Sequence, residues 1–414
     1  MKPIYLYSVV LACVFTYMGC STSTLKLPDI AGTPKQFEPR QIIVTLSEDV
    51  RNQWQSINKE ILDRYDVQPA GEFPLQSIHV NCLVYRVSEM VEVDEIIRRL
   101  RADNRIQLVQ INQVFDGVQG HQVNPYSEMS YGPKMIHSNL AHTIATGKGI
   151  SIAIIDTGVD TEHIELKGRV ATSRNFVDGG NDSFAKDKHG TGVAGVIAAQ
   201  NDNDIGIDGI APDATIDVYK ACWYANANSD KASCSSWTLA KAIDAAVTNG
   251  SRIINLSLAG PEDPLLKQLL TTAEQHHIVL VAAALENKGE PGFPASLDFV
   301  LPVVSADPRG KPSHPSWRIN QGVIAAPGVE ILTTAPGDRY DFLSGSSLAA
   351  AHVTGIIALM LQYQPQLQPE AVRSALKQSS PSTSYVQVND SQSNILVVDA
   401  CHALDALGAT INCP

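Results

Sequence analysis

The sequence predicts an α/β fold built on a doubly wound, mostly parallel sheet with helices on both faces, preceded by a small α+β domain. The first observation is a series of continuous apolar runs in the second part of the chain, at residues 150–155, 215–218, 252–256, 278–283 and 300–304. The second is that helical stretches separate them, at residues 190–199, 236–249 and 264–277. Unbroken apolar strands that alternate with helices are typical of a parallel sheet covered on both faces.

Composition is that of a folded, acidic protein. The chain has 414 residues, which at roughly 150 residues per domain suggests two to three domains. Charged residues make up 18% and hydrophobic residues 44%, far from the balance of a disordered chain. The net charge of −12 provides no electrostatic footprint for phosphate, so we expect no nucleic-acid partner.

The N-terminus predicts export. Lys2 precedes an apolar stretch at residues 4–18, which is too short to span a bilayer core and has the length of a signal peptide, so residues 1–20 are assigned to one. Gly19, Cys20 and Ser21 then resemble the processing site of a bacterial lipoprotein, in which Cys20 becomes lipidated and attaches the protein to a membrane. The alternative is an ordinary signal whose cysteine is discarded. We expect a protein of the cell envelope, periplasmic or lipid-anchored, or a secreted one.

The first domain follows a linker. Residues 21–40 are rich in Ser, Thr, Pro and Gly, as linkers are. Patterns in residues 41–116 predict strands at 41–46, 78–87 and 106–115, helices at 52–64 and 93–102, and an extra strand near 73–75. That order favours one antiparallel sheet covered by two helices. Residues 117–130 form a second, polar linker, and the second domain occupies residues 131–414.

Four of the five cysteines beyond residues 1–20 form two close pairs. In an oxidising compartment, Cys222 would pair with Cys234, and Cys401 with Cys413. Metal binding is the competing interpretation, but neither pair has the two-residue spacing or the histidines of a zinc site. We therefore expect two disulfides.

Three segments carry residue types suited to nucleophilic catalysis. Asp156 follows directly on a predicted strand, His189 stands at the head of a helix rich in small residues, and Ser347 lies near the start of another. A serine at a helix N-terminus sits where backbone N–H groups favour developing negative charge. Each alone is also explained structurally, as a turn residue, a packed histidine and a helix cap.

Together these segments resemble the subtilisin-like serine proteases, the subtilases of peptidase family S8. The resemblance rests on Asp156-Thr157-Gly158, His189-Gly190-Thr191-Gly192 and Ser344-Gly345-Ser346-Ser347, in the order Asp, His, Ser, which is the subtilisin order. It implies that Ser347 is the nucleophile, His189 the general base, and Asp156 the residue that orients the histidine. It also implies that residues 41–116 are a prodomain that assists folding and is cut away within 117–130; the alternative is a permanent binding module.

The resemblance leaves two candidates for the side chain that donates a hydrogen bond in the oxyanion hole. Subtilases donate an Asn amide to the developing oxyanion from a Gly-Asn step after an Ala-rich strand. If this sequence is aligned with the family's without a gap, Leu285 and Glu286 take the places of that Gly and Asn. If the loop is instead one residue longer here, Asn287 takes the place of the Asn. We favour Asn287, because an ionised glutamate only accepts hydrogen bonds.

Substrate binding is predicted along an extended strand. Residues that resemble the family's substrate-binding segments are Ser257, Leu258, Ala259, Gly260, Leu285 and Gly292. Gly292 matches the floor of the pocket for the residue before the scissile bond, and Leu285 would narrow its wall, which favours small or medium apolar residues there.

The chemistry requires no cofactor. A calcium site is possible at Asp202, Asn203 and Asp204, since Ca²⁺ prefers carboxylate and carbonyl oxygens, but the same residues also suit a polar turn.

The predicted function is that of an exported, self-processing serine endopeptidase that acts on proteins or peptides and binds its own prodomain. The alternative is a catalytically impaired subtilase fold that binds peptides. A lipase or esterase is disfavoured by the triad order and by the absence of a Gly-x-Ser-x-Gly elbow around Ser347.

Overall fold

A computed structural model provides the structure. It describes residues 40–117, 130–180, 183–201, 206–226, 229, 231–285, 290–313, 322–379, 387–388, 391–392 and 396–414. The expected signal, residues 21–39 of the first linker and residues 118–129 of the second linker lie outside the described residues.

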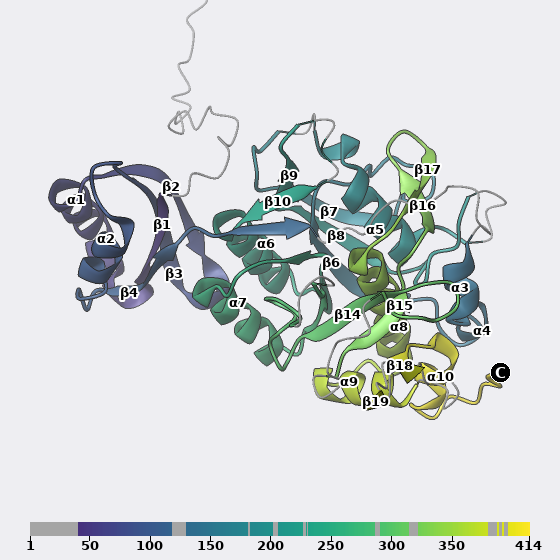
Figure 1. The fold of residues 1–414 in the computed structure, drawn as a ribbon. Helices are drawn as coiled ribbons and strands as arrows, with labels where there is room; N and C mark the ends of the chain where they lie inside the picture. The colour runs from purple at the N-terminus through teal and green to yellow at the C-terminus, as the bar shows by residue number, and fades with distance from the viewer. Residues whose placement is uncertain are drawn as a thin grey trace, which may run out of the picture. The chain divides into compact units, whose positions relative to one another are not determined.

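The N-terminal domain is an antiparallel sheet with two helices on one face (Figure 1). Its strands lie in the order β2-β3-β1-β4, and their bounds are β1 Gln41–Ser47, β2 Val67–Leu75, β3 Val80–Val87 and β4 Ile106–Ile111. The helices are α1 (Trp54–Arg64), preceded by the 3₁₀ turn η1 (Glu48–Gln53), and α2 (Val93–Leu100). Ile57 and Ile61 of α1 are buried against the sheet at helical spacing, as the sequence predicts.

The prediction of one continuous strand over residues 106–115 is wrong. The structure ends β4 at Ile111 and begins a separate strand, β5, at Val114 (Val114–Gly117). Between them, Asn112 Oδ1 accepts the backbone N–H of Trp237 at 3.1 Å, and the N–H of Gln113 donates to Ser236 Oγ at 2.7 Å. These bonds to the start of a helix in the C-terminal domain divert the chain, so β4 and β5 belong to different sheets.

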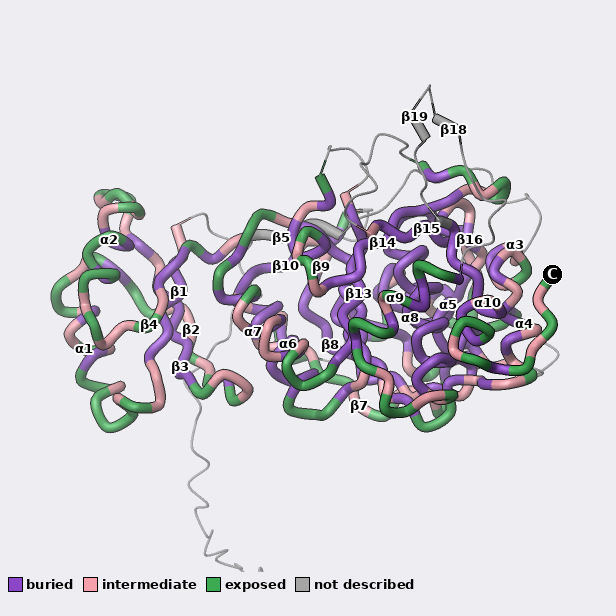
Figure 2. The backbone as a smooth tube through the Cα atoms, turned by 90° about the horizontal axis from the view of Figure 1, so that it is seen from below, coloured by how far each residue is buried: buried purple, intermediate pink, exposed green. Residues whose placement is uncertain are grey.

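The C-terminal domain has the predicted doubly wound parallel sheet. Within the described residues it has eight strands, all paired in parallel, in the order β20-β15-β14-β13-β11-β6-β8-β7. The strands are β6 Ser151–Asp156, β7 Val170–Asn175, β8 Thr215–Lys220, β11 Ile253–Leu256, β13 Val279–Ala283, β14 Leu301–Ala306, β15 Ile324–Pro327 and β20 Leu396–Val397. The central strands are buried along their whole length (Figure 2).

Helices cover both faces of this sheet. They are α3 Tyr131–Met135, α4 Ser138–Ala141, α5 Lys188–Ala198, α6 Ser236–Thr248, α7 Pro264–Gln275, α8 Ser346–Tyr363, α9 Pro369–Gln378 and α10 Ala400–Asp405. One apolar core contains α5 and α8, and a second contains α6 and α7. Helix α8 is apolar and long enough to cross a membrane, but 89% of its apolar window is buried inside the fold, so it serves as the central core helix.

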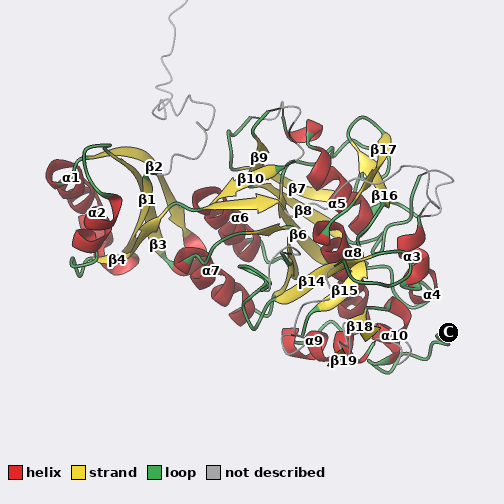
Figure 3. Cartoon of the chain, in the orientation of Figure 1, coloured by secondary structure: helices red, strands yellow, loops and turns green. Residues whose placement is uncertain are grey.

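A second, smaller sheet joins the two domains. Its strands are β12 (Leu258–Ala259), β5, β10 (Ala232–Ser235) and β9 (Cys222–Tyr224), in that order. Two of them, β9 and β10, are labelled side by side in Figure 3. Two further hairpins are formed by β16 (Ile331–Ala335) with β17 (Arg339–Leu343) and by β18 (Gln387–Val388) with β19 (Ser391–Gln392). The remaining 3₁₀ turns are η2 (Gln76–Ile78) and η3 (Phe184–Lys186).

Both expected disulfides are present. Cys222 is bonded to Cys234 and Cys401 to Cys413. The first closes the β9–β10 hairpin, where these two residues face each other in register. The second ties the C-terminal segment to α10. Cys82 is a free, buried thiol.

Candidate active site

Asp156 is the last residue of β6 and lies at the carboxyl edge of the parallel sheet, where sites in such folds form. Its Oδ1 accepts the backbone N–H of Thr157 at 2.6 Å and lies 2.7 Å from Nδ1 of His189. A carboxylate only accepts, so His189 donates from Nδ1 and its Nε2 is left as the basic nitrogen. Both side chains are nearly fully buried, at 3% and 2% exposure.

His189 occupies the second position of α5, a helix whose small residues allow close packing. A Cβ atom on Gly190 would lie 2.5 Å from the carbonyl oxygen of Gly158, so only glycine permits this approach to the turn after β6. The N–H of Gly190 also donates to Thr157 Oγ1 at 2.9 Å. The start of the helix and the turn after Asp156 are therefore locked together.

Ser347 is the second residue of α8 and is fully buried in the structure. Its Oγ donates to the carbonyl oxygen of Ser257 at 3.2 Å. Nε2 of His189 is buried and has no hydrogen-bond partner within the described part of the chain. Ser347 Oγ and His189 Nε2 are therefore not hydrogen-bonded to each other in this structure, and contacts of this kind often form only when substrate binds.

The two neighbouring serine hydroxyls, those of Ser344 and Ser346, have hydrogen-bond partners of their own. Ser346 Oγ donates to the carbonyl oxygen of Ala284 at 2.9 Å, and Ser344 Oγ accepts the N–H of Glu330 at 2.8 Å. All three hydroxyls of this segment are thus bonded to backbone groups, and Ser347 remains the predicted nucleophile because of its place in the motif.

The pKa of His189 reflects two opposing effects. Burial lowers it, because charge is poorly solvated there, but the negative charge and hydrogen bond of Asp156 outweigh burial and raise the pKa above its ordinary value. The pair therefore stabilises the imidazolium that forms when His189 accepts a proton.

Sequence reasoning missed a buried ion pair beside the site. Lys220, at the end of β8 and opposite Asp156 in the sheet, bonds to the Asp187 carboxylate, and Oδ2 of Asp187 also accepts the N–H of Gly158 at 2.7 Å. Burial raises the pKa of Asp187 against the opposing effect of Lys220. The sequence signal that could have indicated this ion pair is a lysine that ends the apolar strand β8.

Part of the predicted substrate strand is already paired. Leu258 and Ala259 form β12, which pairs antiparallel with β5, in the register Leu258 with Gly117 and Ala259 with Asp116. The other edge of β5 pairs with β10. A segment of the chain itself thus lies as a strand between two others, with Ser257 beside the nucleophile.

The predicted pocket residues also meet. Gly292 has a positive φ of 71°, and a Cβ atom there would lie 2.5 Å from Leu285 Cδ1. Leu285 thus packs directly over Gly292. Gly260 forms an isolated antiparallel β-bridge with Phe293, the residue after Gly292.

Other predicted site residues lie outside the described residues. These are Glu286 and Asn287 of the oxyanion hole, the calcium candidates Asp202, Asn203 and Asp204, and Cys20. Across the described ranges, no group of three or more His, Cys, Asp or Glu side chains is arranged to hold a metal ion.

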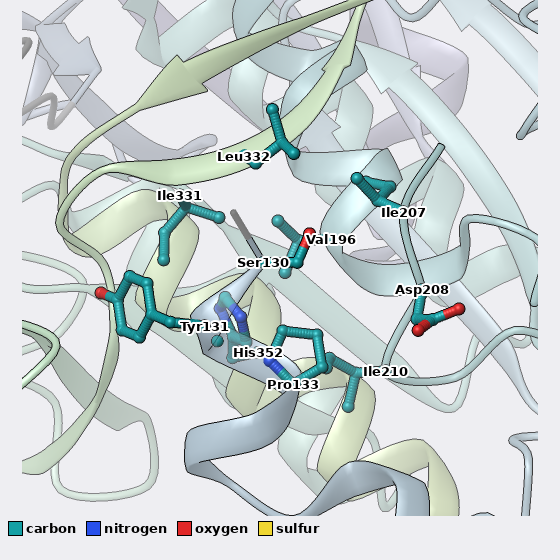
Figure 4. Close-up of a pocket in the computed structure, with 11 residues that line it drawn as sticks. Ser130, Tyr131, Pro133, Val196, Ile207, Asp208, Ile210, Ile331, Leu332 and His352 are labelled. Carbon is teal, nitrogen blue, oxygen red and sulfur yellow. The ribbon is translucent and has the colours of Figure 1, made fainter. Parts of the chain in front are cut away.

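A small cavity is lined by residues of α3, α5 and α8, and Asp156, His189 and Ser347 are not among its lining residues (Figure 4). Its volume of about 10 Å³ is that of a single water molecule. His352 lines it, donates from Nδ1 to the carbonyl oxygen of Leu348 at 2.8 Å, and has a pKa lowered to about 4 by burial. This histidine is a neutral packing residue, and the cavity is not a substrate site.

An Asp–His pair with a helix-borne serine at the carboxyl edge of a doubly wound parallel sheet defines a serine hydrolase. A family model described as the subtilase family, peptidase S8, matches residues 147–396. The chain belongs to the subtilase family, and it is a serine endopeptidase.

Individual relatives agree with this assignment. The thermophilic serine proteinase of Bacillus sp. strain AK1 is 32% identical over 282 residues, which cover 67% of this chain and 68% of that protein. Thermitase of Thermoactinomyces vulgaris is 36% identical over 242 residues, 57% of this chain and 84% of that protein. The crystal structure of fervidolysin, a keratinolytic enzyme from Fervidobacterium pennivorans, has the same fold, with a TM-score of 0.70 and 24% identity over 89% of this chain. The match spans 61% of the fervidolysin chain.

The roles in acyl transfer that the sequence predicts for these residues are as follows. Ser347 Oγ would attack the substrate carbonyl carbon while His189 Nε2 takes its proton. Asp156 would stabilise the resulting imidazolium, and His189 would then return the proton to the leaving amine. Water would repeat the sequence on the acyl-enzyme and free Ser347.

Proposed function

We propose that this endopeptidase is exported and is made as a precursor that cleaves itself after the N-terminal domain. The observation that carries the proposal is the double pairing of β5, which lies between β10 and β12 in the manner of a bound peptide. Its residues follow directly on the N-terminal domain, so that domain supplies the peptide.

The strand register supports one particular bond. Gly117 pairs with Leu258, and Ser257, the preceding residue of that segment, has its carbonyl oxygen 3.2 Å from Ser347 Oγ. If the antiparallel register continued by one residue, it would bring the residue after Gly117 opposite Ser257. That residue is Val118, so the bond between Val118 and Gln119 is the proposed processing site. Valine also suits the pocket that Leu285 narrows.

Processing is tested by comparing purified wild type with Ser347→Ala. The wild-type product is expected to begin at Gln119 by N-terminal sequencing, whereas Ser347→Ala stays full length. Val118→Asp should slow cleavage, and the control Val123→Asp, in the same linker, should not. A precursor that remains uncut in active wild type, or a cut in Ser347→Ala, contradicts self-processing.

The contacts between the domains support a specific prodomain. The Asp244 carboxylate of α6 accepts the N–H groups of Gln76 (3.1 Å) and Ser77 (2.6 Å). At the start of α7, Gln110 Oε1 accepts the N–H of Leu265 at 2.8 Å. Backbone groups at helix starts and turns lack partners of their own, so such bonds favour docking in one orientation.

Export is supported by the two disulfides, which persist in oxidising compartments. Lipidation of Cys20 is tested by labelling cells with a palmitate analogue. Cys20→Ser should abolish the label and release the protein from membranes, and Cys13→Ser, within the apolar stretch, should leave both unchanged. Label retained by Cys20→Ser would refute the anchor.

A fluorophosphonate probe tests whether Ser347 is activated. Such a probe reacts with a serine beside a general base and leaves a helix-capping serine unlabelled. We expect the mature protein to be labelled and Ser347→Ala to be unlabelled. An unlabelled mature protein would favour the peptide-binding alternative instead.

A further inference from the structure

Backbone N–H groups in the first turn of α5, the helix that carries the general base, donate hydrogen bonds to side chains from other elements. The first N–H groups of any helix lack intrahelical acceptors, and the N-cap residue here, Asp187, makes no capping bond with its side chain. The N–H of His189 instead donates to the phenol oxygen of Tyr224 at 3.1 Å. Thr157 fulfils the same role for the next residue, Gly190.

Tyr224 is itself held in place by its hairpin. It is the last residue of β9 and pairs with Ala232 of β10, two residues along from the paired Cys222 and Cys234. The disulfide between those cysteines joins the two strands covalently. The phenol oxygen is therefore held beside the first turn of α5 by a covalently closed hairpin.

We propose that Tyr224 is a positioning residue for His189: its phenol oxygen fixes the backbone of the general base and so the direction in which Nε2 points. His189 then has two anchors, Asp156 at ring Nδ1 and Tyr224 at the backbone N–H, at 2.7 Å and 3.1 Å. One anchor alone would leave the ring free to pivot about the other. General-base catalysis needs the base within hydrogen-bond reach of the nucleophile, so small displacements lower the rate.

The charged groups around His189 come from several elements. Asp156 of β6 bonds its ring, and the buried pair of Asp187, before α5, and Lys220 of β8 lies next to it. Lys188 is paired with Asp341 of β17 at 2.7 Å. The N-terminus of α5 carries partial positive charge, which disfavours the imidazolium, and the phenol oxygen offsets part of that charge at the His189 N–H.

Tyr224→Phe tests the proposal because it removes the acceptor and keeps the ring. In the mature enzyme, the maximal rate of inactivation by a fluorophosphonate should fall about tenfold, with little change in the probe's half-saturating concentration, since about one hydrogen bond is lost. The acid limb of the pH profile should move to lower pH, because the imidazolium loses a stabilising dipole. Loss of packing alone would lower the melting temperature without moving this limb.

Tyr340→Phe is the matched control. It removes one phenol hydrogen bond, to Glu165 Oε1 at 2.8 Å, elsewhere in the same domain, and should leave rate and pH profile unchanged. The pKa of His189 is also measured by NMR in Ser347→Ala, with and without Tyr224→Phe, a readout that needs neither turnover nor self-processing. A lower pKa in the Tyr224→Phe protein supports the proposal. An unchanged pKa together with an unchanged inactivation rate would overturn it.

Discussion

At the residue scale, the balance between burial and ion pairing at His189 determines how activity depends on pH. With His189 as the predicted general base, hydrolysis would require the neutral imidazole, and the pKa of His189 is raised because Asp156 outweighs burial. A raised pKa means that the base becomes protonated, and activity is lost, at a higher pH than for an ordinary histidine of pKa about 6.5. The acid limb of the profile should therefore lie above that value.

Asp156→Asn should reverse this shift. Without the carboxylate only burial acts, so the pKa of His189 should fall below its ordinary value and the acid limb should move to lower pH. Turnover should fall about 10⁴-fold, because the amide no longer enforces the Nδ1–H tautomer. Kinetics from about pH 4 to 9 measure both effects. A limb that stays in place in Asp156→Asn would exclude Asp156 as the cause of the raised pKa.

The oxyanion-hole donor also belongs to this scale. Asn287→Ala should lower turnover about 10²- to 10³-fold with little change in substrate affinity, because the donor acts mainly in the transition state. Glu286→Gln should be mild. If instead only Glu286→Gln affects turnover, the alignment without a gap is correct. A glutamic acid donor would then lose activity as it ionises with rising pH.

At the element scale, β5 explains most of what the sequence could not predict. The sequence predicted the parallel strands, the helices between them and the segments around Asp156, His189 and Ser347, because unbroken apolar runs and glycine patterns are local signals. It predicted a single strand over residues 106–115 because Val114 and Phe115 continue the apolar pattern. The break depends on Asn112 and Gln113 bonding to α6, a contact more than 120 positions away in the sequence. Tyr224 escaped prediction for the same reason, since its partner lies on another element.

Phe115 should govern how firmly β5 is held. Its ring is fully buried, with its centroid 5.8 Å from that of Phe293, and it fills space that a Cβ atom on Gly260 would otherwise take. Phe115→Ala removes this buried aromatic contact, so self-cleavage of the precursor should slow at least about tenfold. A time course of refolding on gels measures the rate.

Leu62→Ala is the control for Phe115→Ala. It removes apolar atoms from α1, in a core that does not include Phe115, and should change the stability of the N-terminal domain more than the cleavage rate. Equal slowing by both variants would show that domain stability, and not the aromatic contact in β5, controls processing.

At the scale of the whole molecule, the Cys401–Cys413 disulfide secures the C-terminal end. Cys401 and the neighbouring Ala400 are buried, and Ala400 belongs to the core around α8. Cys401→Ser with Cys413→Ser should lower the free energy of unfolding by about 3 kcal/mol, the loop-closure entropy for a separation of this size. Activity at 25 °C should be retained, and chemical denaturation measures the loss in the Ser347→Ala background. An unchanged stability would mean that packing of α10 alone holds this end.

One apolar core contains residues of both domains, so separating the domains by cleavage would affect how the mature enzyme unfolds and refolds. Ile43, Leu75 and Val84 of the N-terminal sheet belong to the same buried cluster as Leu239 and Ile243 of α6. The proposed cleavage after β5, followed by loss of the N-terminal domain, would remove part of this apolar core. The mature enzyme would then no longer be at the end of a reversible folding reaction, and its lifetime would be set by the height of its unfolding barrier. Its thermal denaturation would show hysteresis: an apparent melting temperature that rises with heating rate, and no return of activity on cooling unless the excised domain is added back.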